Sequence, residues 1–219
     1  MSVPAEGDLI MLDDNLGQRL SKMVKRGDPG PAAQLAIATK IFEMVDRKAT
    51  APKTRTATHK GVARAKQLMA EALTMTPEER RIVEAPHEIL LIHSPDGRLK
   101  SVTLGNRNKV SIPADLEPGS ILSHNHPSGR GPSDSDLKAV LSFPEMTLRV
   151  VSKNEDGNVE VFSMRFTGEL KKAEIQGFSE LYFDQCNDAG DTHAARRESL
   201  ALISQLIGNS FQVLSRILQ

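Results

Sequence analysis

Two histidines one residue apart, His124 and His126, follow the apolar residues Ile121 and Leu122. Side chains alternate across a β-strand, so residues two apart share a face, and the two imidazole rings can contact one cation. Burying polar rings without partners costs free energy, and an ion shared by both rings would explain why they occupy one face of an apolar strand. The pair therefore predicts half of a metal site.

A carboxylate follows the histidines after a short turn. Residues 127–132 include two prolines and two glycines, a composition that should reverse the chain. Ser133 then begins a pattern typical of a helix N-cap, with Asp136 near the third helical position. We expect the Asp136 carboxylate to point back toward the rings. Two imidazoles and one carboxylate suit Zn²⁺ and leave a fourth tetrahedral position open for water.

These residues resemble the motif of the JAMM (MPN+) metalloproteases, a family that includes deubiquitinases and the bacterial RadC-like proteins. The family motif is an upstream glutamate, then His-x-His, then Ser-x-x-Asp, and the run from His124 to Gly129 is most similar to the RadC-like version. Six residues separate His126 from Ser133, one fewer than is usual in the family, as in some phage-associated and toxin-associated members. With this shorter loop, Asp134 is the alternative to Asp136 as the third ligand.

The resemblance covers about residues 88–164 and implies both a fold and an activity. The implied fold is α/β, a mixed β-sheet with flanking helices, JAB/MPN-like and similar to that of cytidine deaminases. The implied activity is zinc-dependent hydrolysis of a peptide or isopeptide bond, with Zn²⁺ held by His124, His126 and Asp136.

A zinc-bound water that attacks an amide needs a base to take its proton and to pass it to the leaving amine. By the resemblance, Glu88 supplies this base, because it precedes the apolar run 89–92 directly. Glu84 is the competing candidate, and a position on the solvated side of a helix is its simpler explanation. The resemblance also gives Ser133 a part in catalysis, hydrogen-bonding near the metal to help stabilise the oxyanion, beside its role as an N-cap.

The predicted metal site needs a sheet domain to position it, and residues 76–166 have the pattern of one. Thr76 and Glu79 form a capping-box pattern at the start of a short helix. Turns at Asp96-Gly97 and at 154–158 indicate hairpins. We expect strands at 88–93, 99–104, 109–112, 121–126, 148–152 and 159–164.

The two ends of the chain are predicted to be helical extensions. Residues 1–75 contain two helical patterns and a basic linker around residues 48–66, and residues 167–219 are expected to be helical as well. The last helix, about 192–218, has a broad apolar face. That face must be covered, by the amino-terminal helices or, as the alternative, by a second copy in a homodimer.

Composition limits the class of protein. The chain has 28 Lys and Arg residues against 28 Asp and Glu residues, so its net charge gives no general reason to expect nucleic acid or membrane binding. The single cysteine, Cys186, excludes an internal disulfide and a cysteine-based zinc ribbon, and suits a reducing compartment. Without a signal-peptide pattern or a run of about 18 apolar residues, we expect a soluble, cytoplasmic protein.

The sequence therefore predicts a JAMM-type zinc peptidase or isopeptidase acting on a protein, either a ubiquitin-like conjugate or a precursor that it processes. The alternative is a RadC-like protein of DNA metabolism, or a non-catalytic module that uses zinc to hold a binding surface. The basic stretch at residues 48–66 is the local support for nucleic acid. The motif defines how a bond is cut but does not identify the substrate.

Overall fold

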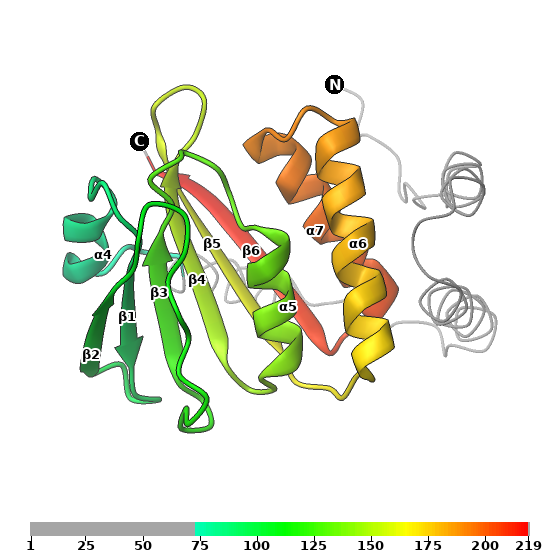
Figure 1. Ribbon diagram of the computed structural model, residues 1–219, viewed down its shortest axis with the longest axis horizontal. Helices are drawn as coiled ribbons and strands as arrows, with labels where there is room; N and C mark the ends of the chain where they lie inside the picture. Colours follow the sequence, from blue (N-terminus) through cyan, green and yellow to red (C-terminus); the bar gives the residue numbers. More distant parts are fainter. Residues whose placement is uncertain (1–72, 219) are drawn as a thin grey trace, which may run out of the picture.

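The computed structural model describes residues 73–218, which build a six-stranded mixed sheet with helices on both of its faces (Figure 1). The strand order is β2-β1-β3-β4-β5-β6, and only the β3 and β4 pair is parallel. The prediction of an α/β fold with a mixed sheet and flanking helices is confirmed. The strands are β1 (Ile89–His93), β2 (Leu99–Leu104), β3 (Ile121–Asn125), β4 (Thr147–Lys153), β5 (Val159–Phe166) and β6 (Phe211–Leu218).

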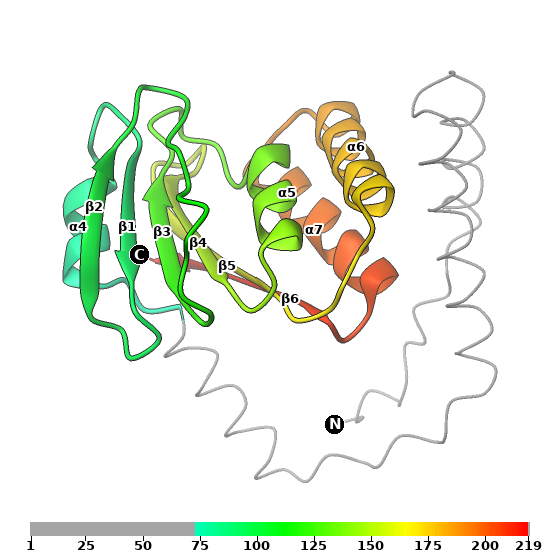
Figure 2. The same ribbon diagram turned by 60° about the horizontal axis from the view of Figure 1, so that its bottom comes forward.

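Four described helices pack on this sheet: α4 (Pro77–Ile82), α5 (Asp134–Ser142), α6 (Lys172–Asp188) and α7 (His193–Ile207). Helix α4 packs against β1 and β3, whereas α5, α6 and α7 group together on the other side (Figures 1 and 2). None of the described helices has the length and apolar character needed to cross a membrane.

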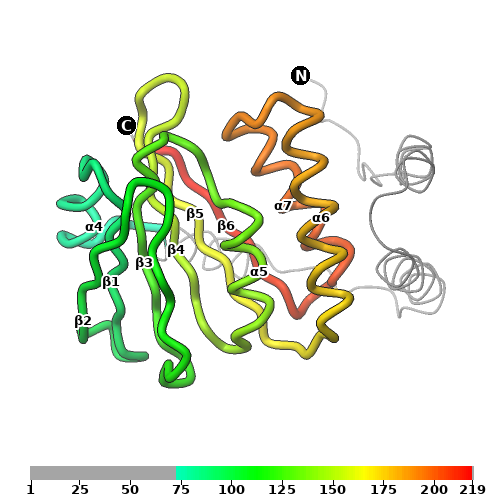
Figure 3. Tube along the Cα trace, viewed as in Figure 1, coloured from blue at the N-terminus to red at the C-terminus, as the bar shows by residue number. Residues whose placement is uncertain are grey.

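The parallel pair creates the place where the predicted metal ligands meet. Parallel strands need a crossover connection, and α5 supplies it between β3 and β4, as the chain trace in Figure 3 shows. The carboxyl end of β3 therefore lies close to the amino end of α5. His126 follows the carboxyl end of β3 directly, and Asp136 lies in the first turn of α5.

The main hydrophobic core lies between the sheet and α5, α6 and α7. Residues two apart along each strand point into it, as the strand alternation requires. The sheet contributes Leu90, Leu122, Val150, Phe162 and Met164, and the helices contribute Leu137, Val140, Phe178, Leu181, Leu200 and Ile203. The intervening strand residues, with α4, form a smaller core on the opposite face from Leu73, Met75, Ile82, Leu91, Val151 and Val161.

The capping box predicted for α4 is confirmed, with Thr76 as the N-cap and Glu79 at the third position. Glu79 has a second role, because its buried carboxylate also accepts hydrogen bonds from Ser123 of β3 and from Arg149 of β4, whose Nε lies 2.6 Å from Oε1. Burial disfavours the Glu79 carboxylate, but these donors outweigh burial and lower its pKa. Helix α4 is thereby tied to the strand that carries His124.

The prediction of one long helix over 192–218 is wrong in its second half. Helix α7 ends at Ile207, before Gly208 with a φ of 81°, and residues 211–218 form β6 along the free edge of β5. In β6 the side chains alternate: Phe211 and Val213 contact the main core, and Leu214 contacts the smaller one. Aromatic and branched residues with a period of two favour a strand once an edge is available for pairing.

The apolar face of α7 packs inside the chain. Leu200, Ile203 and Leu206 are buried in the core that the sheet forms with α6. The sheet and α6 therefore cover these side chains. The sequence predicted instead that the amino-terminal helices or a second copy of the chain would cover them. The expected amino-terminal helices and basic linker lie outside the described residues, apart from 73–75, and no strand forms at the predicted position 109–112.

Candidate metal centre

The two histidines and Asp136 converge as the sequence predicts. The Nε2 atoms of His124 and His126 lie 3.0 Å apart. The carboxylate of Asp136 reaches both rings, with Oδ1 3.1 Å from His124 Nε2 and Oδ2 3.3 Å from His126 Nε2. The alternative ligand, Asp134, has one carboxylate oxygen 3.9 Å from the Nζ of Lys138.

Local helix chemistry aims the Asp136 carboxylate. Ser133 is the N-cap of α5 and Asp136 is its third residue, so the two form a capping box. Asp136 Oδ2 accepts hydrogen bonds from the Ser133 backbone N at 2.6 Å and from its Oγ at 2.7 Å, and Ser133 Oγ accepts one from Asp136 N at 3.2 Å. The Ser133 hydroxyl proton is therefore used to orient Asp136. The oxyanion role suggested for Ser133 stays a prediction.

The backbone of the following loop orients His126. Its Nδ1 lies 3.0 Å from the carbonyl oxygens of both Arg130 and Gly131. Carbonyl oxygens only accept hydrogen bonds, so Nδ1 is the donor, and the lone pair of the neutral ring lies on Nε2, which faces His124 and Asp136. This is the tautomer in which the ring can bind a cation through Nε2.

Glu88 joins the cluster from the position directly before β1. Its side chain is buried, and one carboxylate oxygen lies within 4.8 Å of a ring nitrogen of each histidine. Glu84, the competing candidate, forms an exposed ion pair at 2.7 Å with the Nζ of Lys153. The structure therefore brings together Glu88, both histidines and Asp136, and leaves Glu84 outside.

Asn125 connects the position of Glu88 to that of the histidines. Asn125 lies between His124 and His126 in sequence, but its side chain points to the other face of β3 from their rings. There its Oδ1 accepts a hydrogen bond from the backbone N of Ile89 at 2.8 Å. Its Nδ2 donates to the carbonyl oxygens of His87 at 3.1 Å and Ala85 at 3.3 Å. The backbone is thus held on both sides of Glu88. Nothing in the local sequence around Asn125 predicts these contacts, which lie 36 to 40 residues away.

The charges of the cluster support one another. Burial disfavours the charged form of Asp136, but His124 and His126 outweigh it and hold the pKa of this carboxyl well below its usual range. Burial also opposes the charge on His126, whose pKa is nevertheless raised by Asp136. Burial raises the pKa of Glu88, against the opposing effect of the two histidines. An ionised Asp136 beside two imidazoles is an electrostatic environment that favours a cation.

The donor atoms fit a zinc ion. A tetrahedron with zinc-to-ligand distances of about 2.0–2.1 Å has edges of roughly 3.3–3.4 Å. The Nε2 atoms of His124 and His126 lie 3.0 Å apart, and the nearest Asp136 oxygen to each lies at 3.1 Å from His124 and 3.3 Å from His126, all close to the length of such an edge. The nitrogen and oxygen donors are also of the types that zinc prefers.

A cavity of about 590 Å³ lies beside these side chains. Glu88, His126 and Ser133 are among the residues that line it, and α6 contributes Phe183, whose exposed fraction is 54%. A second cavity of about 360 Å³, between α7 and β6, contains none of the clustered residues.

Comparisons with known proteins give no family for this chain. No family model, no curated protein and no solved structure matches this chain.

Proposed function

We propose that this chain is a zinc-dependent metallopeptidase or isopeptidase of the JAMM type, which hydrolyses a peptide or isopeptide bond in a protein substrate. One observation carries the proposal: the Nε2 atoms of His124 and His126 lie 3.0 Å apart, and each lies 3.1 or 3.3 Å from one of the two Asp136 oxygens, with the Glu88 carboxylate beside them at a cavity. The sequence resemblance to the RadC-like branch of that family supports the same assignment.

The proposed roles follow from the positions of the side chains. His124, His126 and Asp136 would hold Zn²⁺, and Ser133 keeps the Asp136 carboxylate in place through the capping box. When bound, zinc supplies Lewis-acid chemistry that polarises a substrate carbonyl and acidifies a water. Glu88 accepts the proton of the attacking water and returns it to the leaving amine nitrogen. Asn125 holds the backbone on either side of this base.

The test compares Glu88, which lies in the cluster, with Glu84, which lies outside it. Wild-type protein, His126→Ala, Glu88→Gln and Glu84→Gln are reconstituted with zinc, and bound metal is measured together with hydrolysis of carboxy-terminal conjugates of ubiquitin-like proteins. We expect about one zinc per chain in all but His126→Ala. Hydrolysis should fall by at least about 10²-fold in Glu88→Gln, because the general base is lost. Glu84→Gln should behave as wild type, since Glu84 lies outside the cluster.

Two results would contradict the proposal. Wild-type protein that is folded but takes up no zinc would exclude the metal site. A Glu88→Gln variant with full turnover would exclude Glu88 as the base. Stable zinc binding without hydrolysis of any conjugate or peptide, together with salt-dependent DNA binding, would instead favour the RadC-like or non-catalytic alternative.

A further inference from the structure

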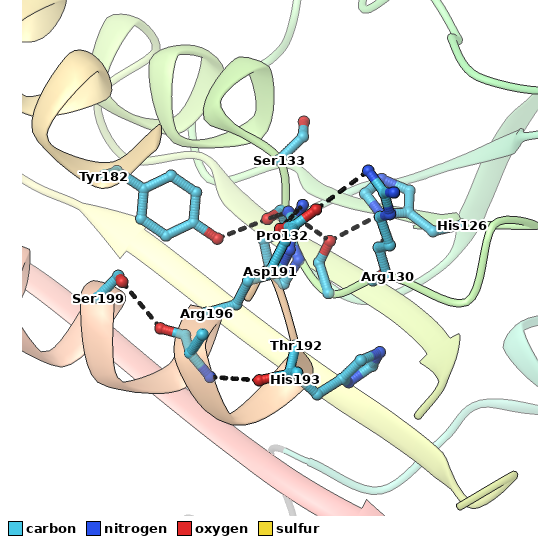
Figure 4. Close-up of polar contacts among 12 residues, drawn as sticks. His126, Arg130, Pro132, Ser133, Tyr182, Asp191, Thr192, His193, Arg196 and Ser199 are labelled. Carbon is cyan, nitrogen blue, oxygen red and sulfur yellow. Dashed lines mark hydrogen bonds and ion pairs between the residues drawn. The ribbon is translucent and has the colours of Figure 1, made fainter. Parts of the chain in front are cut away.

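The loop between His126 and Ser133 presents consecutive backbone carbonyls to side chains on both of its sides. Those of Arg130 and Gly131 accept the Nδ1 hydrogen of His126. Side chains of α6 and α7 approach the same loop from the opposite direction, as Figure 4 shows for Tyr182 and Arg196 around Pro132. The loop therefore lies between the metal cluster and the carboxy-terminal helices.

Arg196 of α7 shares an acceptor with the metal-facing histidine. Its Nη1 donates to the Gly131 carbonyl oxygen, at 3.1 Å, and to that of Pro132. A carbonyl oxygen has two lone pairs, so Gly131 can accept from Arg196 and His126 together. The backbone is also closely packed at this point, because a Cβ on Gly131 would lie 3.2 Å from the Cδ of Arg196 and 3.1 Å from the Cζ of Phe162.

Further contacts hold the loop at its ends. Tyr182 of α6 donates its hydroxyl hydrogen to the Pro132 carbonyl. His193 of α7 donates from Nε2 to the Gly129 carbonyl at 3.0 Å, and its Nδ1 lies 2.9 Å from the buried carboxylate of Glu160. These side chains leave the loop little freedom to shift.

Asp191 connects Arg196 to the loop by a second route. Its carboxylate forms ion pairs with Arg196 and, at 3.0 Å, with the Nη1 of Arg130. The carbonyl of Arg130 is the other acceptor of the His126 ring hydrogen. The residue that supplies the other acceptor is thus also linked to Arg196, through its side chain and Asp191.

We propose that Arg196 is a positioning residue of the metal centre, which sets the orientation of His126 through the Gly131 carbonyl, and that Tyr182 supports it from α6. The inference rests on the proposed zinc site. Partners that orient a metal-binding histidine typically change metal affinity about 10 to 100-fold when they are removed. The carboxy-terminal helices would then belong to the metal centre as well as to the core.

Zinc affinity, measured by competition with a chromophoric chelator on the full chain, tests this inference. The variants are Arg196→Met, Arg196→Lys and Tyr182→Phe, and the matched control is Arg149→Met. Arg149 is also a buried arginine with a carboxylate partner, but it lies on the opposite face of the sheet. All are measured at a temperature where thermal denaturation shows each apo variant to be folded.

We expect Arg196→Met to bind zinc about 10 to 100-fold more weakly than wild type, Arg196→Lys to recover part of the loss, and Arg149→Met to keep wild-type affinity. Equal affinity in Arg196→Met and Arg149→Met would overturn the inference. If Arg196→Met does not fold, unchanged affinity in both Arg196→Lys and Tyr182→Phe would overturn it. A wild-type chain that binds no zinc refutes the proposed function as well, whereas tight binding by wild type and Arg196→Met refutes only the positioning role.

Discussion

At the scale of single residues, Asn125 connects the strand that carries the two histidines to the backbone beside Glu88. One side chain makes three hydrogen bonds to the backbone of the segment that ends at Glu88 and β1, while its two neighbours turn their rings to the other face. The strand alternation thus lets one short segment hold Glu88, the proposed base, from one face and present the proposed zinc ligands on the other.

Replacement of Asn125 by leucine should therefore affect stability and hydrolysis more than zinc binding. The partly buried backbone groups of Ile89 and His87 lose their partners, and the loss of a typical intramolecular hydrogen bond costs about 0.5–1.5 kcal/mol. We expect a free energy of unfolding lower by that amount in urea titrations, with near-normal zinc content. Loss of zinc without any change in stability would show that Asn125 acts on the histidines instead.

The predictability of the site follows from the range of its contacts. The shared face of His124 and His126 and the capping box of Asp136 are local geometry, so spacing alone predicts them. Glu88 could be predicted only from the family resemblance, because its closeness to the histidines depends on the pairing of strands. Arg196 escaped prediction, since it reaches Gly131 across 65 residues and no local pattern encodes that contact.

At the scale of elements, the contact between α4 and the sheet depends on an ion pair. Glu79 caps the helix and binds Arg149 through both oxygens, at 2.6 and 2.9 Å, with almost no exposure to solvent. Breaking such a buried pair by removing one partner typically costs about 3–5 kcal/mol, because the remaining charge stays buried.

This pair predicts a pH dependence of stability. The pKa of Glu79 is lower in the folded chain than its ordinary value of 4.5, so its contribution is fully present above that value and is lost as the pH falls through the lowered one. Glu79→Gln should be less stable than wild type near pH 7, by about 3–5 kcal/mol. The difference should shrink in acid. Denaturant titrations from pH 7 to pH 3 measure it, and a difference independent of pH would contradict the assignment.

The strands were easier to predict than the last element of the chain. The apolar run 89–92 and the Asp-Gly turn after it predict β1 and β2 correctly, because hairpins are local. The apolar residues of β6 suit a helical face as well as a strand, and the choice between them is made by the edge of β5, which is distant in sequence. Only Gly208 gave a local sign that the helix stops.

At the scale of the whole molecule, the proposed zinc would join β3, the loop and α5, which are parts of one core. An ion that binds the folded chain alone stabilises it by about 2.7 kcal/mol when its free concentration is 100 times the dissociation constant. Metal removal should therefore lower the thermal denaturation midpoint of wild type.

The His126→Ala variant provides the control for this prediction. Its midpoint should be the same with zinc or with a chelator, because one of the three proposed ligands is missing. Wild type should show a midpoint several degrees higher with zinc than with the chelator. Equal midpoints for wild type in the two conditions would exclude a contribution of zinc to stability.

Because side chains alternate along β3, the two imidazoles lie on the correct face of the sheet only when β3 pairs with β1 in the native register. A slip of one residue against β1 would carry both imidazoles to the α4 side and would leave the amide of Asn125 facing Asp136. Chains misfolded in this way could not hold the proposed zinc. The metal content of a refolded preparation would therefore count the molecules whose strands are in native register.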